Sequence, residues 1–278
     1  MGNVWGDKKI EIGRVDKLRK NTFKRYLPPI AVDLKNYFIS LKNEFFYRDK
    51  LKENKVFFKK YIGEDVYVIG NGPSLNNFDL KKIAGKKIIS MNHFELHPMK
   101  DSFEIVAHCI GEPIDSYSWE NPTNMLSNIN ADSFWFNFNT SKFFESNPIN
   151  KKIYYYLQGT AFPFFDVKKI DLTKICLPYE STAQMSIAIA IYMGFKNIYL
   201  LGFDHDFLAI KNISTHFYEE RDGVTLSDWS RLKYIERIKM VLKLFSIYDQ
   251  LKIIADESSI NIVNKSNPSY LDVFKVEL

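Results

Sequence analysis

Short apolar runs rich in β-branched residues alternate with longer helical patterns from residue 61 onward. Apolar runs bounded by turn residues are typical of buried strands, and their alternation with helices indicates a mainly parallel sheet. We therefore expect an α/β domain with a single doubly wound, Rossmann-like sheet. The expected strands cover Val66 to Ile69, Lys87 to Ser90, Phe103 to Ala107, Ser133 to Phe136, Asn197 to Leu201 and Ile260 to Val263.

Two segments carry patterns typical of helices. The segment STAQMSIAIAIYMGF consists of small and apolar residues, with Ser181 or Thr182 as a capping residue at its start and Gly194 at its end. It is expected to be buried. A second segment, residues 227–251, repeats apolar residues at three- and four-residue steps with charges on the opposite face. The residues expected to share its apolar face are Trp229, Leu232, Ile235, Ile238, Leu242 and Phe245.

The composition is that of one globular domain with an appendage. The 278 residues, 46% hydrophobic and 15% aromatic, suffice for one sizeable core. Cys109 and Cys176 are far apart and outside any CxxC motif, so neither a disulfide framework nor a thiolate zinc site is expected. The chain shows no signal-peptide pattern, and no apolar stretch approaches the ~20 residues that span a bilayer. These features predict a cytoplasmic protein.

The positive charge is concentrated at the start of the chain. Residues 1–60 contain 16 Lys and Arg against 7 Asp and Glu, a net charge of +9, whereas the chain as a whole carries +5. Since Phe and Tyr are mixed with these cations, residues 1–60 are expected to form a helical extension ahead of a catalytic domain at 61–278. The extension would rest on the inner face of the cytoplasmic membrane; packing on the main domain or forming a homo-oligomer is the alternative.

Nucleic acid is not an expected partner. No DNA- or RNA-binding motif accompanies the cations, and the remaining residues carry a net charge of −4 (22 basic, 26 acidic), which would repel a phosphate backbone.

The first expected strand ends in a turn that allows close backbone approach. The segment VIGNGPSL places Gly70, Asn71, Gly72, Pro73 and Ser74 directly after the strand. The glycines permit positive φ, the proline fixes the next step, and the serine presents a hydroxyl together with the following amides. This geometry suits a phosphate, although a glycine turn can also serve packing alone.

Polar residues also follow two other expected strands. Asn92 and His93 come after the second strand, and Gly202, Asp204 and Asp206 come after the strand that ends at position 201. Doubly wound sheets bind ligands at this carboxyl edge. The Asn92 amide would bond a base, a ribose or a phosphate, or else stabilise its own turn. The two aspartates match a DxD pattern that holds a divalent cation in many glycosyltransferases; a solvated acidic turn is the alternative.

The motifs VIGNGPSL, IISMNHF, STAQMSIAIAIYMGFKNIYLLGFDHDF and STHFY, in this order, resemble those of the small bacterial sialyltransferases that decorate lipooligosaccharide. The resemblance covers residues 65–220, with a weaker echo at 260–274. The GxGPSL opening is also similar to the broader 6-hydroxymethylpterin diphosphokinase MptE-like group. The sialyltransferase likeness implies a single Rossmann-type domain. It would transfer a sialic-acid-like sugar with inversion from a CMP-activated donor to a glycan or lipid-linked glycan acceptor, without a metal or other cofactor.

The resemblance also implies residue roles. Asn71 and Asn92 would contact the donor nucleotide, and Ser74 would lie near its phosphate. His216 would be the general base that deprotonates the acceptor hydroxyl, a task that suits the unperturbed histidine pKa of ~6.5. The residues expected to bind nucleotide or substrate are Gly70, Asn71, Gly72, Pro73, Ser74, Asn92, Ser181, Thr182, Gly202 and Asp204.

One departure from the sialyltransferase pattern leaves alternatives open. The residues expected to be catalytic are His216, Tyr179 and Gln184. Gln184 stands where that family has a tyrosine that stabilises the leaving phosphate, so Tyr179 or the cluster Tyr154–Tyr156 would have to supply the hydroxyl. The cluster would otherwise be a mobile acceptor lid or an aromatic wall of the core. A Mg²⁺-dependent diphosphokinase with Asp204 and Asp206 as ligands is the second hypothesis. The third hypothesis is a non-catalytic nucleotide-binding module.

Overall fold

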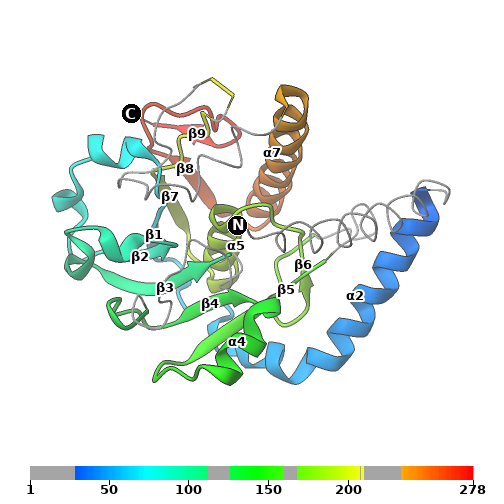
Figure 1. The fold of residues 1–278 in the computed structure, drawn as a ribbon. Helices are drawn as coiled ribbons and strands as arrows, with labels where there is room; N and C mark the ends of the chain where they lie inside the picture. The colour runs from blue at the N-terminus through cyan, green and yellow to red at the C-terminus, as the bar shows by residue number, and fades with distance from the viewer. Residues whose placement is uncertain (1–28, 112–125, 160–167, 207, 210–232, 278) are drawn as a thin grey trace, which may run out of the picture.

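The computed structural model of the protein describes residues 29–111, 126–159, 168–206, 208–209 and 233–277. Nine parallel strands within these ranges form one sheet, in the spatial order β6-β5-β4-β3-β2-β1-β7-β8-β9 (Figure 1). The predicted α/β class with a parallel, doubly wound sheet is confirmed. The strands are β1 Asp65–Ile69, β2 Lys87–Met91, β3 Glu104–Ile110, β4 Phe134–Asn137, β5 Ile153–Gln158, β6 Ile175–Cys176, β7 Asn197–Leu201, β8 Asn261–Asn264 and β9 Lys275–Val276.

The strand order reverses between β1 and β7. The chain moves outward from β1 through β2 to β6, then crosses back by way of helix α5 and continues on the other side with β7, β8 and β9. In open parallel sheets, ligands bind outside the carboxyl ends of the strands at this switch point. Because β1 and β7 are direct neighbours in register, the turns that follow Ile69 and Leu201 meet there.

Six of the nine strands were predicted. Strand β5 was not, because its residues Tyr154–Tyr156 were interpreted as an acceptor lid or a core wall. The interpretation of these tyrosines as a mobile lid is wrong, and their interpretation as an aromatic wall of the core is correct. All three are buried in a strand between β4 and β6. Aromatic side chains favour a pleated surface that is buried on both faces. Strands β6 and β9 contain two residues each, too few for a recognisable sequence pattern.

Helices and short 3-10 turns cover both faces of the sheet. On one face, a hydrophobic layer joins Val68 and Ile89 to residues of α5 and α7; on the other, Ile69 and Ile88 meet residues of the short helices. The α-helices are α2 Pro29–Lys52, α4 Ser141–Ser146, α5 Thr182–Met193 and α7 Tyr234–Glu257. The 3-10 helices are η1 Glu53–Phe57, η2 Pro73–Asn77, η3 Leu80–Ile83, η4 Phe94–Leu96, η5 Lys100–Ser102 and η6 Phe138–Thr140.

Helix α5 has the caps expected from its sequence. The Ser181 hydroxyl accepts a hydrogen bond from the Gln184 amide at 3.3 Å, and Gly194 ends the helix in the left-handed region with a φ of 82°. Every residue of the helix except Ala183 is buried. It packs on β1, β2 and β3 and carries α7 on its other side, so the start of α5 is fixed at the carboxyl edge of the sheet.

The predicted apolar face of α7 is largely exposed. Trp229 and Leu232 lie outside the described residues, Ile235, Ile238 and Leu242 are exposed, and Phe245 is partly buried against the core. The helix instead packs on α5 and β8 through its second half, so its first half carries apolar side chains that face outward. The side chains that it buries recur at the same three- and four-residue steps, at Leu244, Ile247, Tyr248, Leu251, Ile254 and Ala255.

The second half of the N-terminal segment is tied to the sheet. Helix α2 runs along β5 and β6, and Leu51 at its end is fully buried. Buried Asn54 donates from its amide to the carbonyls of Tyr155 and Leu172, at 2.7 Å each. These contacts join η1 to the main domain, while the division of the chain into 1–60 and 61–278 stays a prediction.

Candidate functional site

The turns after β1 and β7 pack backbone against backbone. The Gly70 amide donates to the Leu201 carbonyl at 2.7 Å, and the Gly72 amide donates to the Gly202 carbonyl at 3.0 Å. A Cβ atom at Gly70 would lie 2.5 Å from the Gly202 carbonyl oxygen, and Gly202 itself has a φ of +73°. This mutual approach accounts for the glycines without a ligand, and it brings the two predicted turns into one corner.

Asp204 fills the space beside the first turn. A Cβ atom on Gly72 would lie only 1.6 Å from Asp204 Oδ2. The Ser74 amide donates to the two carboxylate oxygens of Asp204, at 3.1 and 3.3 Å. Burial raises the pKa of Asp204, hydrogen bonds from Ser74 oppose that shift, and the nearby Asp206 carboxylate adds to it. The amide expected to face a phosphate therefore holds the protein's own carboxylate.

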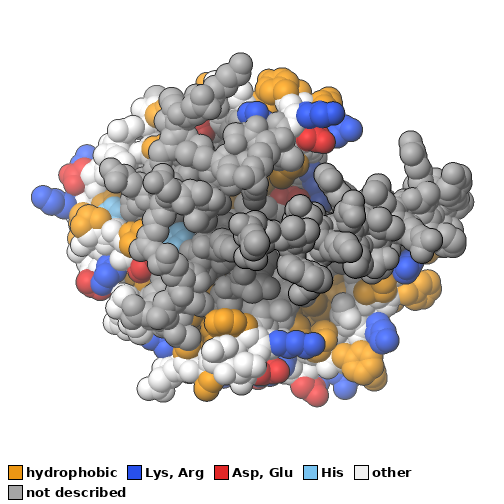
Figure 2. All heavy atoms as spheres, viewed as in Figure 1, with side chains coloured by type: hydrophobic (Ala, Val, Ile, Leu, Met, Phe, Trp, Pro, Cys, Tyr) orange, Lys and Arg blue, Asp and Glu red, His pale blue; other side chains and the backbone are white. Residues whose placement is uncertain are grey.

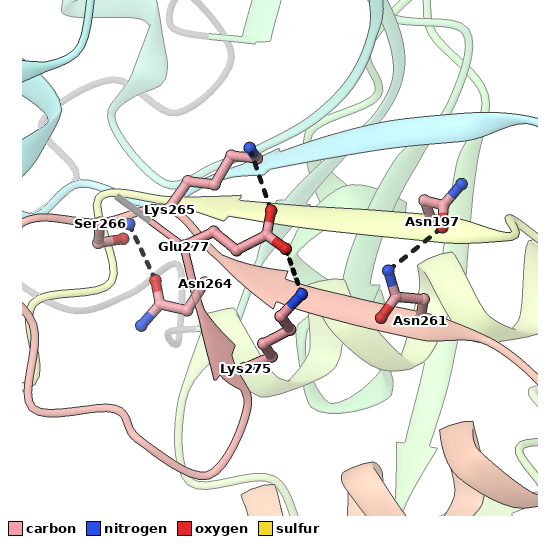
Figure 3. Close-up of polar contacts among 7 residues, drawn as sticks. All are labelled: Asn197, Asn261, Asn264, Lys265, Ser266, Lys275 and Glu277. Atoms are coloured by element: carbon pink, nitrogen blue, oxygen red, sulfur yellow. Dashed lines mark hydrogen bonds and ion pairs between the residues drawn. The ribbon is translucent and has the colours of Figure 1, made fainter.

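The loop after β8 fixes the position of this carboxylate. The Phe203 amide donates to the Ser266 hydroxyl at 2.8 Å, and the Tyr270 amide donates to the Asp204 carbonyl at 2.8 Å. Ser266 in turn donates its amide to the Asn264 side chain at 3.0 Å (Figure 3). Because backbone atoms on both sides of Asp204 are held, its side chain has a defined direction toward the Gly72 turn.

At the outer side of this loop, strands β7, β8 and β9 are joined by polar contacts. Asn261 donates to the Asn197 side chain at 3.3 Å, and Glu277 pairs with both Lys265 and Lys275 (Figure 3). These contacts join the three neighbouring strands at this edge of the sheet.

Asn71 presents a buried amide to the corner. Its side chain is buried, and neither Oδ1 nor Nδ2 has a hydrogen-bond partner among the described residues. A buried polar group without a partner costs about 1–3 kcal/mol, so native structures retain few of them. A carboxamide offers one donor and one acceptor side by side, which matches the edge of a nucleobase or a pair of ribose hydroxyls.

A hydrogen-bond chain joins the ends of β2 and β3 to the start of α5. The Gly111 amide donates to the Thr182 hydroxyl at 3.1 Å, and that hydroxyl donates to Asn92 Oδ1 at 3.0 Å. Asn92 adopts a positive φ of 47°, a conformation that asparagine tolerates well in turns. Asn92 and Thr182 thus meet at the same carboxyl edge as the Gly70 turn, and Asn92 also forms its own turn.

His205, between the two aspartates, is partly buried and contacts other core side chains. Burial lowers the pKa of His205 to about 4, and its Nε2 lies 2.8 Å from the Tyr248 hydroxyl on α7. Its ring also stacks on Phe203. Asp206 is half-buried beyond it. Among the described residues, no group of three or more His, Cys, Asp or Glu side chains is arranged to hold a metal ion.

A histidine–carboxylate pair after β2 was not predicted as a functional feature. His93 Nδ1 lies 3.0 Å from Glu95 Oε1, and the other oxygen of Glu95 is buried without a partner in the described part of the chain. Behind this pair, His108 contacts the Ser90 hydroxyl at 2.8 Å, and burial together with nearby His93 lowers the pKa of His108 to about 3. The available signal was a histidine two residues before a glutamate at a strand's carboxyl end.

Gln184 and Tyr179 lie in the core. Gln184 is fully buried; its Oε1 accepts from the Glu180 amide at 2.8 Å, and its Nε2 donates to the Leu244 carbonyl at 2.7 Å. These bonds give Gln184 a structural role in joining α5 to α7. Tyr179 is buried as well, and burial raises its pKa well above the usual value. The catalytic roles assigned to both from the sequence stay predictions.

His216 lies outside the described residues, so its role as general base also stays a prediction. The predicted nucleotide-binding residues that the structure describes belong to four neighbouring places on the carboxyl edge: the turns after β1, β2 and β7, and the start of α5. A parallel sheet with interlocked turns at its switch point defines a Rossmann-like α/β protein.

Comparison with protein families gives the relationship a name. A family model described as 6-hydroxymethylpterin diphosphokinase MptE-like matches residues 40–209, more than half of the chain. The chain therefore belongs to this family. The match begins within α2 and ends just beyond Asp206, so it includes all three turns of the site. It supports the broader of the two groups that the motifs resemble and lends no support to the sialyltransferase likeness. A search of curated proteins finds no match.

Proposed function

We propose that this protein is a glycosyltransferase that moves a sugar from a CMP-activated donor to a glycan or lipid-linked glycan acceptor of the bacterial surface. The observation that supports the nucleotide part is the buried side-chain amide of Asn71 at the switch point, which has no hydrogen-bond partner among the described residues. The nature of the donor rests on the sialyltransferase-like motifs, and on a glycine turn that contains no lysine of the P-loop type. The transferred sugar would be sialic-acid-like.

In this proposal the donor lies across the carboxyl ends of β1 and β2. Asn71 bonds the base or ribose, and the linked side chains of Asn92 and Thr182 form the neighbouring wall. The phosphate of a CMP-linked sugar carries a single negative charge and gains a second one as CMP leaves, and amide and hydroxyl donors can stabilise this developing charge. For the Ser74 amide to be one of these donors, the carboxylate of Asp204 must give up its present hydrogen bond.

His216→Ala tests the proposed chemistry. Loss of a positioned general base should lower turnover by about 10²- to 10⁴-fold with little change in donor affinity. Transfer from a CMP-sugar to an acceptor would be followed by release of CMP, with and without EDTA. EDTA should leave the rate of the parent protein unchanged.

A diphosphokinase-type phosphoryl transferase is the second candidate, favoured by the family match and by the proximity of Asp204 and Asp206. These two side chains would supply at most two oxygen ligands for Mg²⁺, a number that Mg²⁺ accepts when nucleotide phosphates and water complete its shell. Under this hypothesis EDTA and Asp204→Asn would each abolish activity, and His216→Ala would be nearly silent. Nucleotide binding without sugar transfer or phosphoryl transfer would favour the third hypothesis, a non-catalytic nucleotide-binding module.

A further inference from the structure

Helix α2 carries a stripe of large apolar side chains on the side that faces away from the sheet, called here the outer face. The positions follow one another at steps of four, three and four residues, with a further aromatic residue beside the last, so they share one side of the helix. They are Leu34, Phe38, Leu41, Phe45 and Phe46, which are 41, 63, 40, 70 and 66% exposed. In Figure 1 the helix extends past the edge of the sheet, at the right of the view.

The opposite side of α2 attaches the helix to the protein. Glu44 accepts a hydrogen bond from the Ile175 amide at 3.2 Å, and the Tyr47 ring packs on Phe138 with centroids 4.0 Å apart. Ser40 and Leu51 are buried. Among the described residues, these contacts between the helix and the main domain lie on the side opposite the outer face.

Cations are interleaved with the apolar side chains. Lys42 lies over the Phe46 ring at 5.7 Å and Arg48 over the Phe45 ring at 5.8 Å. In Figure 2, orange and blue side chains alternate on the part of the surface that α2 forms. The exposed cations of the helix's two outer flanks are Lys35, Lys42, Arg48 and Lys52, and the exposed carboxylate among them is Asp49, which pairs with Arg48 and Lys52.

We propose that the outer face of α2 binds an anionic lipid surface. Phenylalanine rings enter the interface between headgroups and acyl chains, while lysine and arginine stems lie along them with their charges at the anionic headgroups. A second copy of the chain is a poorer occupant, because an isologous contact would bring the same cations together. No helix in the described part of the chain is long and apolar enough to cross a membrane, so the contact would lie in the plane of the surface.

The net charge of +9 in residues 1–60 adds to the attraction, since each cation near an anionic surface contributes on the order of a fewfold increase in binding. The inference does not depend on the proposed function, because it concerns only where the protein lies.

Vesicle sedimentation with the full chain tests the inference. The parent should sediment with phosphatidylglycerol vesicles at low salt and stay in solution with phosphatidylcholine vesicles. Phe38→Ser with Phe45→Ser, and separately Lys42→Glu, should each lower the partition coefficient by about tenfold. Leu242→Ser is the matched control, because this α7 side chain is 67% exposed, away from α2, and should leave sedimentation unchanged.

Equal sedimentation with both vesicle types would overturn the inference, and so would α2 variants that sediment like the parent. Light scattering on the same samples measures the oligomeric state and so distinguishes a second copy of the chain from a lipid surface as the occupant. A parent dimer that the two phenylalanine substitutions convert to a monomer, without any vesicle binding, would assign the outer face to a second copy and overturn the lipid proposal.

Discussion

Replacing Gly72 with alanine is expected to lower the free energy of unfolding by about 2–6 kcal/mol. The new Cβ atom would lie 1.6 Å from Asp204 Oδ2, so the carboxylate or the turn must move. Overpacking of this kind costs about 1–3 kcal/mol. Moving the carboxylate also breaks its hydrogen bond with the Ser74 amide and leaves buried groups unpartnered, at about 1–3 kcal/mol more. Urea unfolding followed by circular dichroism measures the loss.

Gly63→Ala is the matched control for that substitution. Gly63 has a φ of +81°, and a Cβ atom there would have nothing within 4 Å. The control therefore reports backbone strain alone, about 1–2 kcal/mol for a left-handed residue. If Gly72→Ala costs no more than Gly63→Ala, the carboxylate of Asp204 moves aside freely, and the corner is looser than its geometry indicates.

Asn71→Ala should weaken nucleotide binding by about tenfold or more and leave the unliganded protein as stable as the parent within about 1 kcal/mol. The first effect follows from the loss of a donor and an acceptor that the ligand would use, each contributing about 0.5–1.5 kcal/mol. The second follows because neither amide atom has a partner in the described residues. Isothermal titration with CMP and urea unfolding measure the two effects.

Asn54→Ala is the control for Asn71→Ala, because the same chemical change should here affect stability and not nucleotide affinity. Asn54 is also buried, but its side-chain amide nitrogen donates to two backbone carbonyls. Its removal should lower the free energy of unfolding by about 2–4 kcal/mol and leave nucleotide affinity unchanged. An Asn71→Ala protein that is destabilised like Asn54→Ala and binds nucleotide like the parent would assign Asn71 to structure alone.

Secondary-structure elements were predicted correctly where the local sequence pattern agrees with the environment of the element in the folded protein. Strand β7 matches its predicted bounds, and α5 has the predicted caps, because short buried segments between turn residues allow few other arrangements. Strand β5 was missed because a run of tyrosines has no apolar–polar alternation. The apolar face predicted for α7 is largely exposed, because apolar residues recur at helical spacing on more than one side and only packing on α5 decides which of them are buried.

The sequence predicted where the site lies in the fold, but not the contacts between its residues. Parallel strands end at one edge of the sheet, so polar residues after β1, β2 and β7 were expected to meet there. The bond between Ser74 and Asp204 joins residues 130 positions apart, and no local pattern encodes it. The pairing of Gln184 with the Leu244 carbonyl is equally non-local. The glycines were interpreted as allowing a ligand to approach or as serving packing alone, and the structure adds close contacts of Gly70 with Gly202 and of Gly72 with Asp204.

A thermal-shift titration with CMP, with ATP plus Mg²⁺ and with UDP tests directly whether the parent protein binds a nucleotide. At a concentration of ~100 times its dissociation constant, a ligand of the native state adds about 2.7 kcal/mol to the free energy of unfolding. CMP is expected to raise the melting temperature without a metal, and the shift should be smaller in Asn71→Ala. A shift with ATP and Mg²⁺ alone would favour the diphosphokinase. No shift with any of the three at millimolar concentration would contradict the claim that the switch-point corner binds a nucleotide.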